Sequence, residues 1–585
     1  MEAGGIGESP RGGLHDVAAT TANWFRRCWG APLWLHAALL LVVLVALIPV
    51  GRFDASFSSD EGAAILQAQR LEAGQSYLRP NELQVIDPEG KAFFVTLSEG
   101  GPREFATYAK HPAYAWMLAA IGKVAGVFGM TVLSTLAVVL AAVAGAFVAR
   151  AWDPALARLS LWVLGIGSPL LFESQVVLAH SIGAALAGFA ALSVIVAIQR
   201  RSPARLAGAA ALIATACLFR TEAMLFALAV GSALGYIAVR KRRVDLALGS
   251  AGIVIAAGVA TFADRFWVGR VLGQATVPLN TVGENFLFGR LGSIAGTFIL
   301  PGATWPPLVY YALLVLLVAL VATAVAVRRH PRLFGLFRAG CVVVIVAAVL
   351  PLTATPDTIG SLLITCPILT AGWSLLARDD LEGADRRFAA MTCIFYTVAV
   401  LATQYSEGGS AEWGARFLAL MLPVALPLAL MSLKRTGASL SRPDRRLGSV
   451  ALIVASMSMA TLSITSLRHY RTVSGEWLTQ VSHALAVTEV PDLGDGDGRP
   501  IVVTTWPGLG RMAWPLEPMP RGLSVPPGSL RHYAEAMRSE GIKEFVLAST
   551  EPELDLGQLS GLYAPIRSFP EGRASPGPVL IMRMV

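Results

Sequence analysis

Residues 35–61 decide the fold of this chain and read LHAALLLVVLVALIPVGRFDASFSSDE. With its apolar flanks, the run 35–50 approaches the roughly 17–25 residues that cross a hydrocarbon core. A short polar segment follows and ends on the acidic pair Asp60 and Glu61. Charge beside a membrane span is costly unless it has a partner or a function. These residues therefore predict a membrane protein and point to its functional site.

The rest of the chain repeats the apolar pattern. Its 585 residues are 55% hydrophobic and only 15% charged. Long apolar runs joined by short polar links predict an α-helical polytopic membrane protein with about 13 transmembrane helices. An ordinary water-soluble globule is excluded, because these runs would place large apolar patches in water.

The net charge of +8 reflects membrane topology. Cytoplasmic loops are enriched in lysine and arginine, and here basic clusters occupy alternate loops. This predicts a multi-pass plasma-membrane protein with a cytoplasmic N-terminus and, given an odd number of spans, an extracytoplasmic C-terminus. No nucleic-acid partner is expected. The clusters lie at 26–27, 200–205, 240–243, 328–332, 386–387 and 434–446.

Several familiar chemistries find no support in the sequence. The five cysteines show neither metal-ligand spacing nor a disulfide pattern. There is no Walker loop, no GxSxG turn and no HExxH motif. No cofactor is expected, and a divalent metal is compatible with the chain but not implied. The first apolar run is interpreted as a span rather than a cleavable signal peptide.

The chain is predicted to have three parts. Residues 1–30 form a polar cytoplasmic tail, and residues 31–466 form the transmembrane region with an external loop at 51–111. Residues 467–585 are richer in Asp, Gly and Pro, and predict a small C-terminal extracytoplasmic α/β domain. Its expected strands are 501–506, 545–548 and 579–585, with a helix at 530–539. Trp506 and Trp514 are either sugar-stacking residues or part of its core.

The external loop is predicted to contain interfacial helices. A capping-box pattern begins at Ser58, and Gly74 would end that helix. Apolar residues share one helical face, which suits a helix lying on the membrane surface. A second interfacial segment begins at Pro112. Its expected headgroup anchors are Tyr108, Tyr114 and Trp116.

Charged residues gather in the segments expected outside, and each has an alternative interpretation. Glu61 can cap its own helix, and Asp60 gains from the helix dipole. A lysine such as Lys110, next to His111, can snorkel to lipid phosphate. The remaining residues suit ion pairing or a polar cavity open to the outside, with Arg416 able to pair with Glu412 four residues earlier. These remaining residues are Glu173, His180, Arg220, Glu222, Glu412 and Arg416.

The order and sidedness of three short motifs resemble the GT-C membrane glycosyltransferases. The motifs are the acidic pair Asp60-Glu61, the Lys-x-Pro-like residues 110–112, and the late Gly-x-Arg ending at Arg416. The resemblance covers roughly residues 31–465. It is nearest in style to bacterial protein O-mannosyltransferases, aminoarabinose transferases and arabinofuranosyl transferases.

The resemblance implies a role for each residue. Asp60 matches the catalytic aspartate, with Glu61 as its neighbour. Donor-phosphate binding would fall to Lys110, His111, Arg416 and Arg220, although His111 stands where some members have proline. The expected substrate contacts are Tyr108, His180, Glu412 and Trp413.

The implied reaction requires few catalytic groups. An acceptor hydroxyl would attack the anomeric carbon of a polyprenyl-phosphate sugar, with inversion. Phosphate already leaves readily, so one base suffices, unlike the two carboxylates of glycoside hydrolysis. The partners would be this lipid donor, an envelope glycan, lipid or protein acceptor, and membrane lipids. The alternatives are a lipid-linked-oligosaccharide flippase or transporter, and a glycan polymerase or ligase.

Overall fold

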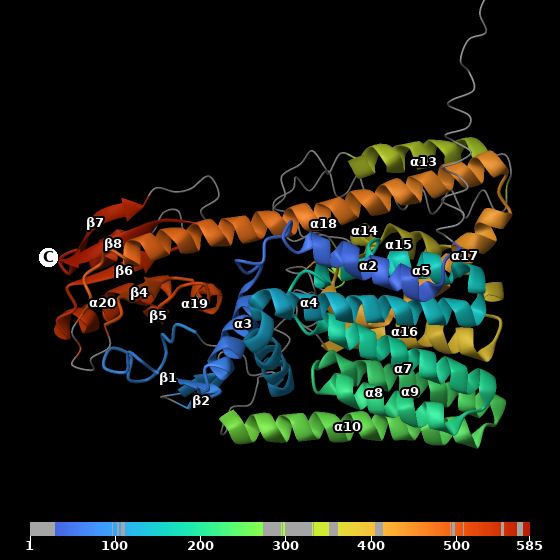
Figure 1. Cartoon of the computed structure of the whole chain (residues 1–585), viewed down its shortest axis with the longest axis horizontal. Coiled ribbons are helices and arrows are strands. Elements are labelled where there is room, and N and C mark those ends of the chain that lie inside the picture. Colours follow the sequence, from blue (N-terminus) through green and yellow to red (C-terminus); the bar gives the residue numbers. More distant parts are fainter. Residues whose placement is uncertain are drawn as a thin grey trace, which may run out of the picture.

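The computed structural model describes residues 30–95, 98–101, 104–106, 111–272, 294, 297–298, 330, 333–349, 361–403, 413–491, 493, 498–506, 508–550, 555–569 and 577–585. A bundle of long helices carries a small sheet domain at one end, which we call the domain end (Figure 1). The helices of the bundle are α2 (Leu33–Leu47), α4 (Pro112–Trp152), α5 (Ala157–Gly165), α6 (Leu170–Glu173), α7 (His180–Arg200), α8 (Pro203–Cys217), α9 (Glu222–Lys241), α10 (Val244–Leu272), α13 (Phe334–Val349), α14 (Leu362–Thr365), α15 (Pro367–Ser374), α16 (Ala384–Thr403), η5 (Arg416–Met421), α17 (Leu422–Ala438) and α18 (Arg442–Leu485).

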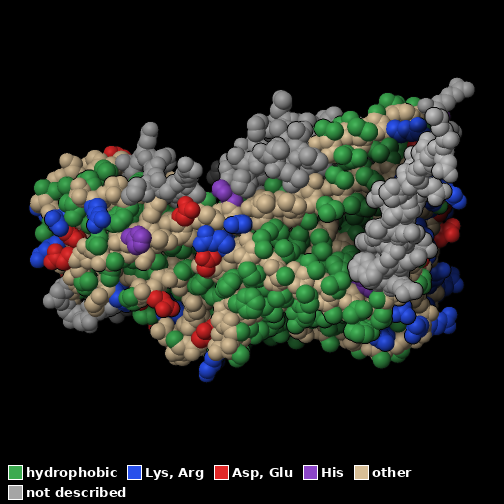
Figure 2. Space-filling model, turned by 45° about the horizontal axis from the view of Figure 1, so that its top comes forward, with side chains coloured by type: hydrophobic (Ala, Val, Ile, Leu, Met, Phe, Trp, Pro, Cys, Tyr) green, Lys and Arg blue, Asp and Glu red, His purple; other side chains and the backbone are tan. Residues whose placement is uncertain are grey.

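The predicted class is confirmed. Six helical segments among the described residues are long and apolar enough to cross a membrane: α4, α7, α9, α10, the segment Arg416–Ala438 and α18. Figure 2 shows hydrophobic side chains covering much of the bundle, with Lys and Arg gathered at the end far from the sheet domain. Large apolar side chains such as Leu248 and Phe262 are about 70% exposed, as expected where helices face lipid. The count of 13 stays a prediction, because some expected spans lie outside the described residues.

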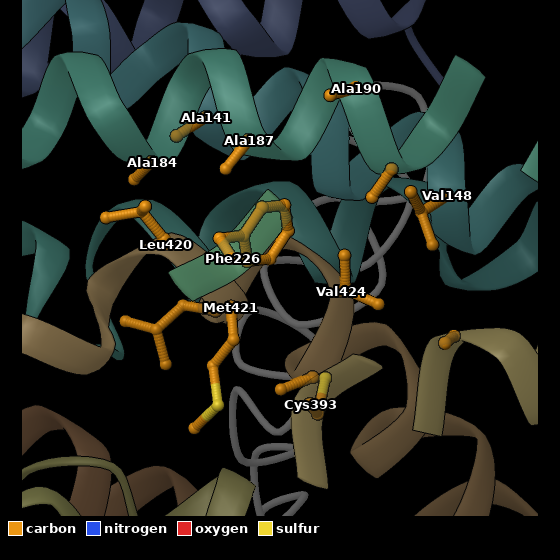
Figure 3. Close-up of a cluster of buried hydrophobic side chains, with 14 of the residues drawn as sticks. Ala141, Val148, Ala184, Ala187, Ala190, Phe226, Cys393, Leu420, Met421 and Val424 are labelled. Atoms are coloured by element: carbon orange, nitrogen blue, oxygen red, sulfur yellow. The ribbon is translucent and has the colours of Figure 1, made fainter. Parts of the chain in front are cut away.

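Small residues let the bundle helices approach closely. Side chains from several helices meet around Phe226 and Met421, with many alanines between them (Figure 3). A Cβ placed on Gly188 would lie only 2.8 Å from the Pro423 Cβ, so glycine permits the contact between α7 and α17. Packing of this kind, rather than water exclusion, holds helices together in lipid.

The interfacial helices differ partly from the prediction. Helix α3 (Ser59–Glu72) forms as expected, and the Ser58 Oγ accepts the Glu61 amide at 3.3 Å. It does not lie free on a membrane surface, because it is buried between α4 and α19 (Gly508–Met512). A Cβ on Gly62 would lie 2.5 Å from the Arg511 carbonyl oxygen. The C-terminal domain therefore covers the face of α3 that α4 leaves open.

Helix α4 is broken near its start. Gly126 has φ 59° and ψ −157°, which separates a short first segment from the long span. Trp116 is 51% exposed on this segment, as an interfacial anchor would be. Tyr114 is fully buried, so the prediction of an anchor is wrong for this residue. Tyr108 lies outside the described residues.

Helix α18 joins the bundle to the C-terminal domain. It continues through residue 466 to Leu485, so the predicted boundary falls inside one helix (Figure 1). The sheet has the order β5-β4-β6-β8-β7, with β4 parallel to β5 and β6, and β8 antiparallel to β6 and β7. The three expected strands are present, and β5 and β7 were not predicted. The elements are β4 (Ile501–Thr504), β5 (Arg521–Ser524), α20 (Leu530–Ser539), β6 (Glu544–Ala548), β7 (Tyr563–Phe569) and β8 (Val579–Met584).

The loop at 51–111 also pairs with the C-terminal domain. Its strands form a three-stranded antiparallel sheet in the order β1-β3-β2. Phe93 makes an isolated bridge with Leu523 of β5. The loop and the domain therefore form one layer over the domain end of the bundle. The loop strands are β1 (Leu78–Pro80), β2 (Ser98–Gly101) and β3 (Glu104–Ala106).

Candidate active site

Asp60 and Arg416 form an ion pair at the domain end. The Arg416 Nη2 lies 2.9 Å from the Asp60 Oδ2, although the residues are 356 positions apart. The Asp60 side chain is 31% exposed, and that of Arg416 is 8% exposed. The N-terminus of α3 favours the negative charge of Asp60. The local partner predicted for Arg416 was Glu412, which lies outside the described residues.

A sharp turn aims Arg416 at Asp60. Gly414 and Ala415 have φ of +63° and +53°, and a Cβ on Gly414 would lie 2.4 Å from Pro169. Just before this turn, the Trp413 ring stacks on Phe172 with centroids 5.3 Å apart. Trp413 is only 2% exposed, so its ring is buried in this stack, and the substrate contact predicted for it stays a prediction. Its packing fixes the turn that places Arg416.

Glu61 is an internal anchor in this structure. Its side chain is 1% exposed, and its Oε1 accepts from the Arg471 Nη2 at 2.6 Å and from the Val177 amide at 2.9 Å. Its Oε2 accepts the Phe57 amide at 2.6 Å, rather than the Ser58 amide of a capping box. With both oxygens engaged, Glu61 has no surface for a substrate. Its predicted role beside Asp60 in catalysis stays a prediction.

Sequence reasoning missed Arg471. This fully buried residue of α18 also donates to the backbone carbonyl oxygens of Gln175, at 2.8 Å, and of Arg52. It therefore connects α18 to the start of the loop at 51–111 and to the turn before α7. The sequence signal that could have identified Arg471 is an arginine within a helical stretch that continues an apolar span.

A second group of charges lies deeper at the same end. The Arg220 guanidinium makes a two-point contact with Glu222, at 2.7 and 2.9 Å, and both side chains are buried. The His180 Nδ1 lies 3.5 Å from the Glu173 Oε2, and these side chains are 1% and 2% exposed. The pairing expected for Arg220 is present. His180 is buried, and the substrate contact predicted for it stays a prediction.

The imidazole of His111 lies between Asp264 and Thr221. Its Nδ1 lies 3.3 Å from the Asp264 Oδ2, and its Nε2 lies 3.3 Å from the Thr221 Oγ1. His111 is 4% exposed, so binding a phosphate would require it to exchange one of these partners. Asp264 was not predicted from the sequence. Lys110, like Tyr108 and Glu412, lies outside the described residues, so its role stays a prediction.

The C-terminal domain brings another cation toward Asp60. Burial lowers the pKa of Arg511, and the Asp60 carboxylate opposes this shift. Arg511 belongs to α19, whose backbone packs against α3 at Gly62. Nothing in the local sequence distinguishes Arg511 from other arginines of this domain. Asp60 thus lies between charges supplied by the bundle and by the domain.

No group of three or more His, Cys, Asp or Glu side chains among the described residues is arranged to hold a metal ion. The charge in this region is instead organised as ion pairs between carboxylates and cationic side chains.

The carboxyl group of Glu173 is strongly perturbed. Burial raises its pKa to about 7, while Arg416 and Arg220 lower it and Glu61 raises it. A glutamate in an unfolded chain loses its proton near pH 4.5. The folded state therefore keeps a proton that the unfolded state has lost between these pH values, and stability falls as pH rises through this window.

Replacing Glu173 with glutamine should remove this pH-dependent loss of stability. We expect Glu173→Gln to be more stable than wild type by about 3 kcal/mol above pH 7, with the gain shrinking toward pH 4.5. Melting temperatures of the two proteins in detergent at pH 5 and pH 8 test this. The exposed Glu540→Gln is the control. A gap between wild type and Glu173→Gln that is equal at both pH values would contradict the prediction.

Comparisons with known proteins agree on the fold. No family model and no curated protein matches the chain. Two crystal structures of ArnT, an aminoarabinose transferase from Cupriavidus metallidurans, superpose on it with a TM-score of 0.51. The undecaprenyl phosphate complex is 11% identical and the apo form 13% identical. The superpositions cover 94% of this chain and 98% and 97% of theirs.

A third structure extends the likeness. The apo oligosaccharyltransferase from Archaeoglobus fulgidus superposes with a TM-score of 0.50 at 12% identity, covering 90% of this chain and 73% of its own. All three structures are of GT-C membrane glycosyltransferases. This chain therefore has the GT-C fold, with a bundle of membrane helices and a small C-terminal sheet domain, and the resemblance inferred from the motifs is confirmed at this level.

Proposed function

We propose that this protein is an inverting glycosyltransferase that moves a sugar from a polyprenyl-phosphate donor to a cell-envelope acceptor. The observation that carries the proposal is the Asp60–Arg416 pair at the domain end. A partly exposed carboxylate there is held against a guanidinium by two distant segments of the chain. A base next to a cation is the combination that hydroxyl attack with phosphate departure requires.

The proposed orientation places this site outside the membrane. Helices α7 and α9 begin at the domain end, beside the buried charges, and finish at Arg200 and Lys241 in basic clusters. Positively charged loops stay in the cytoplasm, which supports an extracytoplasmic site and C-terminal domain and a cytoplasmic N-terminus. A lipid-linked donor and its acceptor would then meet at the outer face of the plasma membrane.

In the proposed reaction, Asp60 accepts the proton of the acceptor hydroxyl as its oxygen attacks the anomeric carbon. The bond from this carbon to the phosphate oxygen breaks, and the phosphate leaves with the electron pair. Arg416 would stabilise the negative charge that grows on the phosphate, with Lys110, His111 and Arg220 as further predicted contributors. Arg416 would therefore exchange or share its contact with Asp60 when the donor binds.

A lipid donor is supported by the broad apolar surface of the bundle and by the ArnT neighbour, which was crystallised with undecaprenyl phosphate. One displacement at the anomeric carbon inverts its configuration. The sugar and the acceptor are to be identified by experiment.

The test is a donor panel. Membranes containing the protein would receive radiolabelled polyprenyl-phosphate sugars, including arabinose and mannose, one at a time, with a crude envelope acceptor. We expect transfer from one donor, with an inverted anomeric centre in the product. Movement of lipid-linked sugar across vesicles without transfer would favour the flippase alternative. Preference for oligosaccharide-lipid over monosaccharide-lipid donors would favour a polymerase or ligase.

A further inference from the structure

A groove of about 540 Å³ opens between α3, the first segment of α4 and the chain that follows α19. Its walls come from both the bundle and the C-terminal domain. The lining mixes polar, charged, aromatic and apolar side chains, so it suits neither a lipid tail nor a metal ion alone. The residues that characterise it are Gln69, Glu72, Lys123, Trp514, Glu517 and Met519.

Glu72 points to a missing hydrogen-bond donor. Its Oε1 is buried and has no hydrogen-bond partner among the described residues. Buried polar atoms in native proteins are nearly always satisfied, and a ligand in the groove that donates to the Glu72 carboxylate would satisfy it. A Cβ on Gly122 would lie 1.8 Å from this oxygen, so only glycine leaves room for the carboxylate.

Trp514 provides a rigid aromatic wall. Its indole Nε1 donates to the Ser56 Oγ at 2.6 Å, which fixes the ring between the external loop and the domain. Trp506, the other tryptophan considered for sugar binding, instead packs against Trp477 with ring centroids 5.7 Å apart. Only Trp514 of this pair lines the groove. A fixed ring of this kind offers an apolar face to a flat partner at little entropic cost.

The groove lies along the same helix as the proposed base. Leu66 and Glu72, which line it, follow Asp60 by six and twelve residues, or about 9 and 18 Å along the axis of α3. A ligand in the groove is therefore too far from Asp60 to be the reacting group itself. It can only be a more distant part of a molecule whose end reaches Asp60.

We propose that this groove binds the acceptor as an extended glycan, at sugar residues beyond the one that is modified. The inference rests on the proposed function. Sugar hydroxyls would donate to Glu72 and Glu517, Gln69 can donate and accept, and the apolar face of a sugar ring would stack on Trp514. These groups recognise an oligosaccharide, and they give a single sugar too few contacts.

The experiment measures oligosaccharide binding in the absence of the polyprenyl-phosphate sugar, so the result does not depend on sugar transfer. Radiolabelled oligosaccharides released from the envelope of the source cells would be size-fractionated and passed over immobilised full-length protein in detergent. Gly122→Leu displaces Glu72 and fills the groove. Ala73→Trp fills it from an exposed position. Gly208→Leu makes the same change as Gly122→Leu where an added Cβ meets nothing within 4 Å.

We expect wild type and Gly208→Leu to retain oligosaccharides but not free monosaccharides. Both groove variants should lose retention by about tenfold or more, which corresponds to the loss of one or two hydrogen bonds to charged groups. Equal retention by all four proteins, or no retention by wild type, would overturn the inference. Because no donor is present, failure of the donor panel would bear on the proposed function and leave this result standing.

Discussion

Asp60→Asn is expected to lower the rate of sugar transfer by about 10²–10⁴-fold, the usual contribution of a positioned general base. Asparagine has nearly the same shape as aspartate but cannot accept the proton of the attacking hydroxyl. The measurement is transfer from the donor identified in the panel, at equal protein level. The main effect should fall on kcat, because Asp60 is proposed to act on the reacting proton.

Asp54→Asn is the matched control for this experiment. Asp54 lies in the same loop and also pairs with an arginine, Arg52, but its side chain is 59% exposed. Its substitution should leave transfer within about twofold of wild type, since exposed ion pairs contribute little. Loss of the Asp60 charge also leaves Arg416 largely buried beside a neutral partner, so the melting temperature is to be recorded. Full activity of Asp60→Asn would place the base elsewhere.

Arg471→Met should destabilise the protein by about 3–5 kcal/mol, because Glu61 would stay buried without its counter-charge. The two side chains are 2% and 1% exposed, so water cannot replace the lost partner. Transfer should fall as well, since Glu61 fixes the start of α3 next to Asp60. The measurements are the melting temperature in detergent and the transfer rate of the folded fraction.

The double variant Glu61→Gln/Arg471→Met separates stability from positioning. Removing both charges should recover part of the lost stability. Replacing a whole buried ion pair costs less than removing one partner, which leaves the other charge buried and unpaired. Arg468→Met, on an exposed position one turn earlier in α18, should change neither property. If Arg471→Met melts at the wild-type temperature, the buried Glu61–Arg471 pair does not stabilise the contact between α18 and α3.

Much of the candidate site was visible from the sequence because its residues follow local rules. Asp60 lies in the first turn of a helix that Ser58 caps, and Arg220 is two residues from its partner Glu222. Roles that depend on distant partners were not visible. The sequence shows that Glu61 can cap its own helix, but not that it pairs with Arg471, 410 positions away.

Packing also determined which of several other residues are buried and which are accessible. Tyr114 and Trp116 are two positions apart and equally suited to an interface, but one is fully buried and the other is 51% exposed. Trp506 and Trp514 differ for the same reason, since only the second lines the groove. Propensity cannot separate such pairs, because it describes a residue and its neighbours in sequence rather than the surface that covers it.

The sequence by itself determined that this is a polytopic helical membrane protein with a small C-terminal α/β domain, because apolar length, loop charge and strand patterns are local properties. Only the tertiary structure decided which charges meet. The fold joins Asp60 to Arg416, withdraws Glu61 into a pair with Arg471, and closes a groove between α3, α4 and the domain. Such contacts depend on how distant helices pack, which decides whether a charge is enclosed in an ion pair, as Glu61 is, or stays partly exposed, as Asp60 does.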